Sequence, residues 1–281
     1  IERIELLGDD NKLDILFYRP QEESAESEIV KLKLYHRHVP IHLSDVLPML
    51  ENFGLRVIDE SPYRVTNDDG EVSWIMDFSM LHKNGQNFEM EKAQELFQDA
   101  FSKTWNKTLE DDGFNRLILS AGITGRNVTI LRAYAKYMRQ IGSSFSIDYM
   151  ANTLSNYPDI ATDVVSLFRL LFCPKIKRMP KKIQTLKETL LAKLDKVSNL
   201  DDDRIIRRYL ELINATLRTN FYQNDSEGNE KSYISFKLLP SEISDMPLPM
   251  PKFEIFVYSP RVEGVHLRGG KVARGGLRWS D

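Results

Sequence analysis

The chain has 281 residues, of which 42% are hydrophobic and 28% are charged, as in an ordinary globular protein with two or three structural units. The formal net charge of −3 gives no general attraction to nucleic acid or to an acidic membrane surface. A single cysteine, Cys173, excludes an internal disulfide and fits a reducing cytosol. The sequence shows no signal peptide and no apolar run of bilayer length. We therefore expect a cytoplasmic protein that neither spans a membrane nor binds nucleic acid.

Residues 1–27 are expected to form a hairpin and a linker that belong to an upstream unit. Two apolar runs within residues 1–19 flank a Gly/Asp/Asn turn, which is the usual signal of a β-hairpin. Pro20 and the acidic stretch QEESAESE then read as a linker. Because the first residue is Ile1 rather than Met, and because the chain stops directly after a glycine-rich loop, both ends are expected to be cuts within a longer polypeptide.

Residues 28–86 show a compact βαββ pattern. Alternating Val30, Leu32 and Leu34 predict a half-buried strand. Ser44 is expected to cap a short helix that Gly54 ends. Strands are predicted over 55–65 and 72–80, and the apolar residues of the second strand share one face, which predicts that helices cover that side. The order of these elements resembles the small amino-acid-binding regulatory domains of the ACT type.

Residues 87–223 change to a helical period and are expected to form a helical domain. The predicted helices span residues 90–105, 112–120, 124–141, 146–155, 158–172, 181–197 and 201–222. Three aspartates, Asp201 to Asp203, suit the first turn of the last helix because negative charge complements the helix dipole there. No repeat at a fixed period is present, which argues against a solenoid.

Residues 224–281 are predicted to begin an α/β domain with strands over 233–238 and 253–258. The second strand is expected to run into a loop in which glycines and cations alternate. The glycines are Gly264, Gly269, Gly270, Gly275 and Gly276, and the cations are Arg261, Arg268, Lys271, Arg274 and Arg278. Glycine permits close backbone approach, and the arginine fork suits carboxylate or phosphate. The pattern favours a loop that holds a small anion over a surface loop whose arginines merely pair with nearby acids.

Two other clusters are given structural interpretations. His36, His38 and His42 lack the cysteine or carboxylate that would complete a tetrahedral metal set, so we interpret them as solvated residues at a strand end. No metal site is therefore predicted. A basic cluster around Pro180 lacks the interleaved aromatics of a nucleic-acid surface and is interpreted as a solvated loop between helices.

The segment PKFEIFVYSPRVEGVHLRGGKVARGGLRWSD resembles the beginning of the catalytic domain in the large NAD-specific glutamate dehydrogenases. The resemblance continues upstream through NVTILRAYAKYMRQ, TNFYQ and the βαββ unit, and so covers essentially the full chain. It implies oxidative deamination of L-glutamate to 2-oxoglutarate and ammonium, with NAD as cofactor. It also implies a substrate-binding turn made by Arg274, Gly275, Gly276 and Arg278, in which Arg274 stands where the shorter glutamate dehydrogenases have a lysine.

The same resemblance places the catalytic lysine and the NAD-binding domain beyond Asp281. No Gly-x-Gly-x-x-Gly turn follows a strand in this sequence, so no catalytic or cofactor-binding residue is assigned and the chain itself is expected to be inactive.

The expected fold class is α+β: an ACT-like βαββ unit over 28–86, a multi-helix layer over 87–223 and the first strands of a truncated α/β catalytic domain over 224–281. The expected partners are L-glutamate and 2-oxoglutarate, an amino-acid effector, and further copies of the chain in a homo-oligomer. The alternative function is a non-catalytic module that senses an amino acid or supports oligomerisation.

Overall fold

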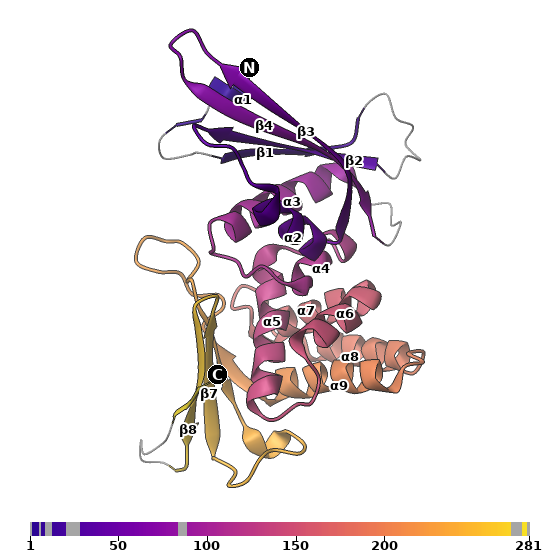
Figure 1. Cartoon of the computed structure of the whole chain (residues 1–281). Coiled ribbons are helices and arrows are strands. Elements are labelled where there is room, and N and C mark those ends of the chain that lie inside the picture. The colour runs from indigo at the N-terminus through magenta and orange to yellow at the C-terminus, as the bar shows by residue number, and fades with distance from the viewer. Residues whose placement is uncertain are drawn as a thin grey trace. The chain divides into compact units, whose positions relative to one another are not determined.

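The protein is described by a computed structural model, in which residues 2–5, 7–8, 13–20, 29–83, 89–270 and 277–279 are described. The chain divides into two compact units, Ile1–Gly125 and Arg126–Asp281 (Figure 1). Each unit has its own sheet and its own helices, so the protein mixes helix and sheet as expected. The four-part division expected from the sequence stays a prediction.

The first unit is built on a four-stranded antiparallel sheet with the strand order β1-β2-β4-β3. Its elements in chain order are α1 (Glu2–Glu5), β1 (Leu13–Tyr18), β2 (Ile29–Arg37), α2 (Leu43–Asn52), β3 (Leu55–Thr66), β4 (Val72–His82), α3 (Met90–Trp105), the 3-10 turn η1 (Gly113–Asn115) and α4 (Arg116–Ser120). Figure 1 shows α2 and α3 on the same side of this sheet.

The two faces of the sheet differ in polarity, as the alternation in the sequence predicted. Leu32 of β2 pairs with Phe78 of β4, and both side chains are fully buried. On the opposite face, Asp77 lies 3.8 Å from the ammonium of Lys31 and 3.5 Å from that of Lys33. The helices therefore cover the apolar face, and burial of that face stabilises the unit.

The hairpin predicted over residues 1–19 is wrong. Glu2–Glu5 is a helical turn, and Leu13–Tyr18 pairs with β2 as an edge strand of the sheet. Phe17 is fully buried and stacks on Phe97 of α3, with ring centroids 4.4 Å apart. By joining the sheet the strand buries its apolar face against α3, whereas an isolated two-stranded hairpin would be only marginally stable.

Helix α2 begins one residue before the predicted capping position. Leu43 is its first residue, His42 occupies the capping position without a side-chain bond, and Ser44 instead bonds Asp45 at 3.5 Å, so the predicted Ser44 cap is wrong. The predicted stop at Gly54 is confirmed. Gly54 has φ +80°, and its N–H donates to the carbonyl of Glu51, which is the left-handed turn that favours glycine after a helix.

The second unit combines a helical layer with a five-stranded antiparallel sheet of order β5-β6-β7-β8-β9. Its elements are α5 (Gly125–Gln140), α6 (Ile147–Asn156), α7 (Pro158–Phe172), α8 (Pro180–Leu194), α9 (Leu200–Ala215), β5 (Thr216–Thr219), β6 (Ile234–Leu238), the 3-10 turn η2 (Pro240–Glu242), β7 (Phe253–Ser259), β8 (Val262–Arg268) and β9 (Leu277–Trp279). None of the helices in the described residues of either unit is both long and apolar enough to cross a bilayer.

Helix α5 packs against the second sheet through aromatic side chains. Tyr134 stacks on Phe236 of β6 with ring centroids 4.2 Å apart, and Tyr137 contacts Phe256 of β7 at 5.4 Å. All four side chains are fully buried. This aromatic face of α5 therefore covers the sheet.

The last predicted helix is too long at its carboxyl end. It stops at Ala215, and Thr216 begins strand β5, which pairs with β6. The Thr216 hydroxyl donates to the carbonyl oxygen of Leu212 and lies 2.8 Å from the hydroxyl of Tyr134. Leu217, which falls within the predicted helix, lies in β5 and is 47% exposed. Pairing with β6 therefore outweighs the helical pattern at this point.

The loop predicted after residue 258 begins as a strand instead. Residues 262–268 form β8, which pairs with β7 across a tight turn, so Gly264, His266 and Arg268 lie in a β-hairpin. Val265 in this strand is fully buried. Gly264 and Arg268 interrupt the alternation of apolar and polar residues that identifies a strand, so the sequence did not predict β8.

Candidate functional site

Of the four residues assigned to the substrate turn, only Arg278 lies among the described residues. Arg274, Gly275 and Gly276 fall outside the described residues. Arg278 lies in β9, where its backbone is opposite Val265 of β8. The ladder places one end of the predicted turn at the edge of the five-stranded sheet.

Gly269 and Gly270 lead into the turn without crowding. A Cβ built at either position would meet no atom within 4 Å, and neither residue has a positive φ. Contacts with the described residues of this chain therefore do not require glycine there. The absence of side chains at these two glycines leaves space beside the backbone for a ligand or for another segment.

A buried carboxylate lies under the strand that leads to the turn. Glu254 of β7 is fully buried and accepts a hydrogen bond of 2.7 Å from the hydroxyl of Tyr137 on α5. Toward the turn that joins β7 and β8, Glu263 of β8 is paired with Tyr258, lies 3.9 Å from the ammonium of Lys136 and accepts a bond of 3.1 Å from Gln140. Polar contacts of this kind fix the hairpin on α5, because a buried carboxylate is costly unless it is hydrogen-bonded.

Sequence reasoning missed Glu254 and Tyr137. A glutamate inside the apolar run FEIFVY was a usable signal, because an acid at an inward position of a strand requires a partner. What the sequence lacked was the identity of that partner, which lies 117 residues away.

The histidine cluster behaves only partly as predicted. His38 and His42 are exposed, but His36 is 9% exposed, with Nδ1 lying 3.0 Å from the carbonyl oxygen of Val39. The interpretation of His36 as solvated is therefore wrong, since it packs 6.3 Å from the ring of Trp105. Among the described residues, no three His, Cys, Asp or Glu side chains gather as a metal site would require.

The basic cluster around Pro180 lies on the surface. Lys175, Lys177 and Arg178 are exposed in the connection between α7 and α8, and Lys181 and Lys182 are exposed in the first turn of α8. Their exposure agrees with the interpretation of a solvated cluster, but only the part before Pro180 is a loop.

Three family models match successive parts of the chain. Residues 12–93 match the ACT3 domain of glutamate dehydrogenase, and residues 109–174 match helical motif 3 of glutamate dehydrogenase. Residues 189–281 match the catalytic domain of bacterial NAD-glutamate dehydrogenase.

Curated relatives match along nearly the whole chain. The NAD-specific glutamate dehydrogenase of Pseudomonas aeruginosa is 49% identical over 279 residues, which is 98% of this chain. That of Halomonas elongata is 49% identical over 281 residues, or 100% of the chain, and that of Mycobacterium tuberculosis is 38% identical over 267 residues, or 92%. The chain spans only 17%, 17% and 16% of the lengths of these three relatives. Successive matches to parts of one kind of enzyme, in one order and at this identity, show that the chain belongs to the bacterial NAD-specific glutamate dehydrogenase family.

Proposed function

We propose that the chain is part of an NAD-dependent glutamate dehydrogenase that converts L-glutamate, NAD⁺ and water to 2-oxoglutarate, ammonium, NADH and a proton. The carrying observation is the 49% identity to enzymes of that name over nearly the whole chain. In this reaction a hydride passes from the α-carbon of glutamate to NAD, and water then hydrolyses the resulting imine. No residue of this chain is assigned to NAD, and the chain alone is proposed to be inactive.

We assign part of the glutamate pocket to Arg274, Gly275, Gly276 and Arg278. Glutamate carries two carboxylates, and burying them requires cations and hydrogen-bond donors. Guanidinium groups supply both, and glycines let the backbone approach the ligand. Support comes from the match of residues 189–281 to the catalytic-domain model and from the position of Arg278 at the sheet edge.

The function can be tested on the longer polypeptide that contains this segment. NADH formation is followed by absorbance with L-glutamate, and 2-oxoglutarate and ammonium are measured as products in equal amounts. L-aspartate and L-glutamine are the matched substrates, since each changes one feature of the glutamate side chain. Failure to reduce NAD with glutamate, or equal rates with all three amino acids, would contradict the proposal.

For the first unit we propose an ACT-like regulatory or oligomerisation role. The sheet presents an exposed edge strand, β3, on which Ile58 is 54%, Tyr63 is 52% and Val65 is 37% exposed. Exposed apolar side chains on an edge strand favour pairing with another chain, and an effector would then bias the assembly. Ile58→Asp should lower the subunit count in sedimentation velocity, whereas unchanged assembly would remove β3 from the interface.

We keep a cytoplasmic location as part of the proposal, because the single cysteine fits a reducing compartment.

A further inference from the structure

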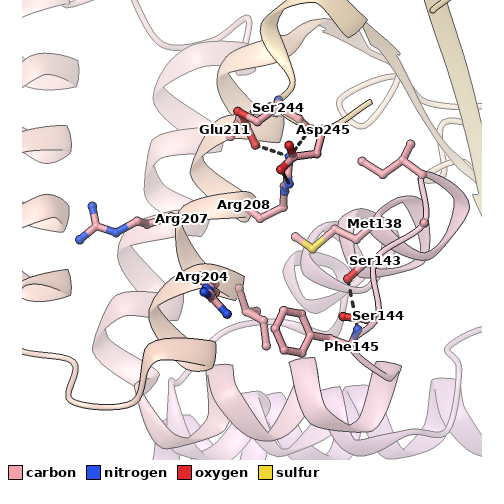
Figure 2. A pocket seen from close by; sticks show the side chains of 13 residues that line it. Met138, Ser143, Ser144, Phe145, Arg204, Arg207, Arg208, Glu211, Ser244 and Asp245 are labelled. Atoms are coloured by element: carbon pink, nitrogen blue, oxygen red, sulfur yellow. Dashed lines mark hydrogen bonds and ion pairs between the residues drawn. The ribbon is translucent and has the colours of Figure 1, made fainter. Parts of the chain in front are cut away.

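We propose that the second unit contains a binding site for a small organic anion with an apolar body. A cavity of about 630 Å³ lies between the end of α5, the face of α9 and the segment around Ser244 (Figure 2). The volume falls within the usual range for small-molecule sites. The inference rests on this geometry alone and does not depend on the proposed dehydrogenase activity.

The floor of the cavity is apolar. Met138 and Ile141 from α5 and its end, and Ile205 from α9, line the cavity while exposing at most 8% of their surface to water. Phe145 adds an aromatic wall, and its ring stacks on Tyr149 with centroids 5.7 Å apart. Such a floor would favour an alkyl or aryl group over a wholly polar ligand.

The rim beside α5 is fixed by its own hydrogen bonds. Gly142 follows the helix with φ +91°, its N–H donates to the carbonyl of Arg139, and the N–H of Ser143 donates to that of Met138. The side chain of Arg139 also donates to the carbonyl oxygens of Ser143 and Phe145. These bonds form a glycine-terminated helix end that holds the rim in place before any ligand arrives.

The opposite wall is held by Arg208. Its guanidinium donates to Glu211 at 2.7 Å, to the carbonyl oxygen of Ser244 at 2.7 Å and to Asp245 at 3.4 Å. Glu211 in turn accepts from the amide of Ser244 at 2.7 Å. Arg208 is therefore engaged in building the wall, so a ligand would gain little by competing for it.

The other two arginines of the cavity differ in how firmly they are engaged. Arg207 donates to both carboxylate oxygens of Asp203, at 2.8 and 2.9 Å, and its side chain extends away from the other lining residues in Figure 2. Arg204 is 61% exposed at its side chain and makes a single 3.3 Å contact with Asp201. An exposed pair of this kind contributes little, so a ligand anion can replace Asp201 as the partner of Arg204.

The lining as a whole favours an anion. Of the lining acids, Glu211 and Asp245 are both held by Arg208, and the oxygens of Glu211 accept bonds from Arg208 and Ser244, which leaves Arg204 as the weakly paired cation of the lining. A carboxylate or a phosphate monoester offers the oxygens that a guanidinium binds best. We therefore assign Arg204 to the charged end of the ligand and the Met138–Phe145 floor to its apolar body.

The test is a titration of the 281-residue chain labelled with ¹³C at the methionine methyl groups. Hexanoate and hexyl phosphate are the anionic probes, hexylamine has the same body with the opposite charge, and acetate lacks the body. Met138→Leu assigns the Met138 signal. Both anions, or either one, should shift this signal saturably, whereas hexylamine and acetate should leave it unchanged at the same concentrations. Tighter binding of hexyl phosphate would assign the site to phosphate esters, and tighter binding of hexanoate would assign it to carboxylates.

Arg204→Gln should weaken anion binding by about tenfold or more, because the guanidinium is replaced by a neutral amide. Arg207→Gln is the matched control on the same helix and should change binding by less than about twofold. Unperturbed methyl signals away from the cavity would show that both variants fold. The proposal is overturned if neither anion shifts Met138 saturably, if hexylamine binds as tightly as hexanoate, or if the two variants weaken binding equally.

Discussion

At the scale of single residues, the side chain of Asp202 links helix α9 to helix α6. Its carboxylate is 7% exposed and accepts a 2.9 Å hydrogen bond from the hydroxyl of Thr153, which is 1% exposed. Its N–H also donates to Asn199, the capping residue of α9. Burial and then the negative charge of Asp202 raise the pKa of nearby Tyr157. The carboxylate thus connects two helices and the start of one of them.

We predict that Asp202→Ala lowers the free energy of unfolding by about 2–3 kcal/mol, because it leaves the Thr153 hydroxyl buried without this acceptor. Asp201→Ala is the control: Asp201 lies in the same first turn but its side chain is 48% exposed, so its loss should cost less than about 1 kcal/mol. Urea unfolding measures both values. Equal costs for the two variants would show that the buried carboxylate has no special role.

His82 gives the first unit a dependence on pH. It is 6% exposed at the end of β4, and burial lowers its pKa from the usual 6.5. The unfolded state therefore takes up a proton at a higher pH than the folded state. The contribution of neutral His82 to the stability of the folded state is therefore complete above the unfolded-state pKa of about 6.5. It is lost as the pH falls through the lowered folded-state pKa.

We predict that the urea midpoint of the first unit falls between pH 7.5 and pH 5.5, and that His82→Gln makes this fall smaller. Trp74 and Trp105 both lie in the first unit and can report its unfolding by fluorescence. If the wild type and His82→Gln lose the same stability over this pH range, another group is responsible.

At the scale of elements, the pairing of β1 with β2 determines which strands make up the first sheet. The sequence contains two apolar runs around a turn, and nothing local distinguishes pairing with each other from pairing with a distant strand. Long-range contacts settle the choice, since Phe17 packs on Phe97 and its N–H donates to the side chain of Gln98 at 2.9 Å. Tertiary packing overrides the hairpin signal here.

Phe17→Ala should destabilise the first unit by about 3–5 kcal/mol, because a fully buried ring is removed from the contact between β1 and α3. Tyr18→Ala is the neighbouring control, since Tyr18 points to the other, charged face of the sheet beside Lys33 and is only half-buried. We expect it to cost about 1 kcal/mol or less. Comparable losses in the two variants would mean that β1 is not packed on α3 in solution.

Helices with a strong apolar period were predictable from the sequence. Helices α3 and α7 begin and end at the predicted residues; Pro158 marks the start of α7, and the apolar period marks the extent of α3. Elements that depend on strand pairing were not predictable in the same way. Thr216 and Val262 begin strands β5 and β8, although the sequence favoured a helix at one place and a loop at the other.

At the scale of the whole molecule, the two candidate sites differ in whether the sequence alone could predict them. The arginine-lined cavity gathers residues from 138–145, 204–211 and 244–245, which no local pattern connects. Arg274, Gly275, Gly276 and Arg278 were found through a resemblance carried by a contiguous motif, and their part in substrate binding stays a prediction. A contiguous motif can be read from sequence, whereas a site assembled by packing requires the fold.

The most direct test of the central claim is the Michaelis constant for glutamate of the longer enzyme, compared among wild type, Arg274→Ala, Arg274→Lys and Arg218→Ala. Arg218 is an exposed arginine of β5 and controls for loss of a positive charge. Losing charge-assisted bonds to a carboxylate should raise the constant for Arg274→Ala by roughly tenfold to a hundredfold. Arg274→Lys should retain most of the affinity, and Arg218→Ala should match wild type. An unchanged constant in Arg274→Ala, with normal folding, would contradict the assignment of this turn to the glutamate pocket.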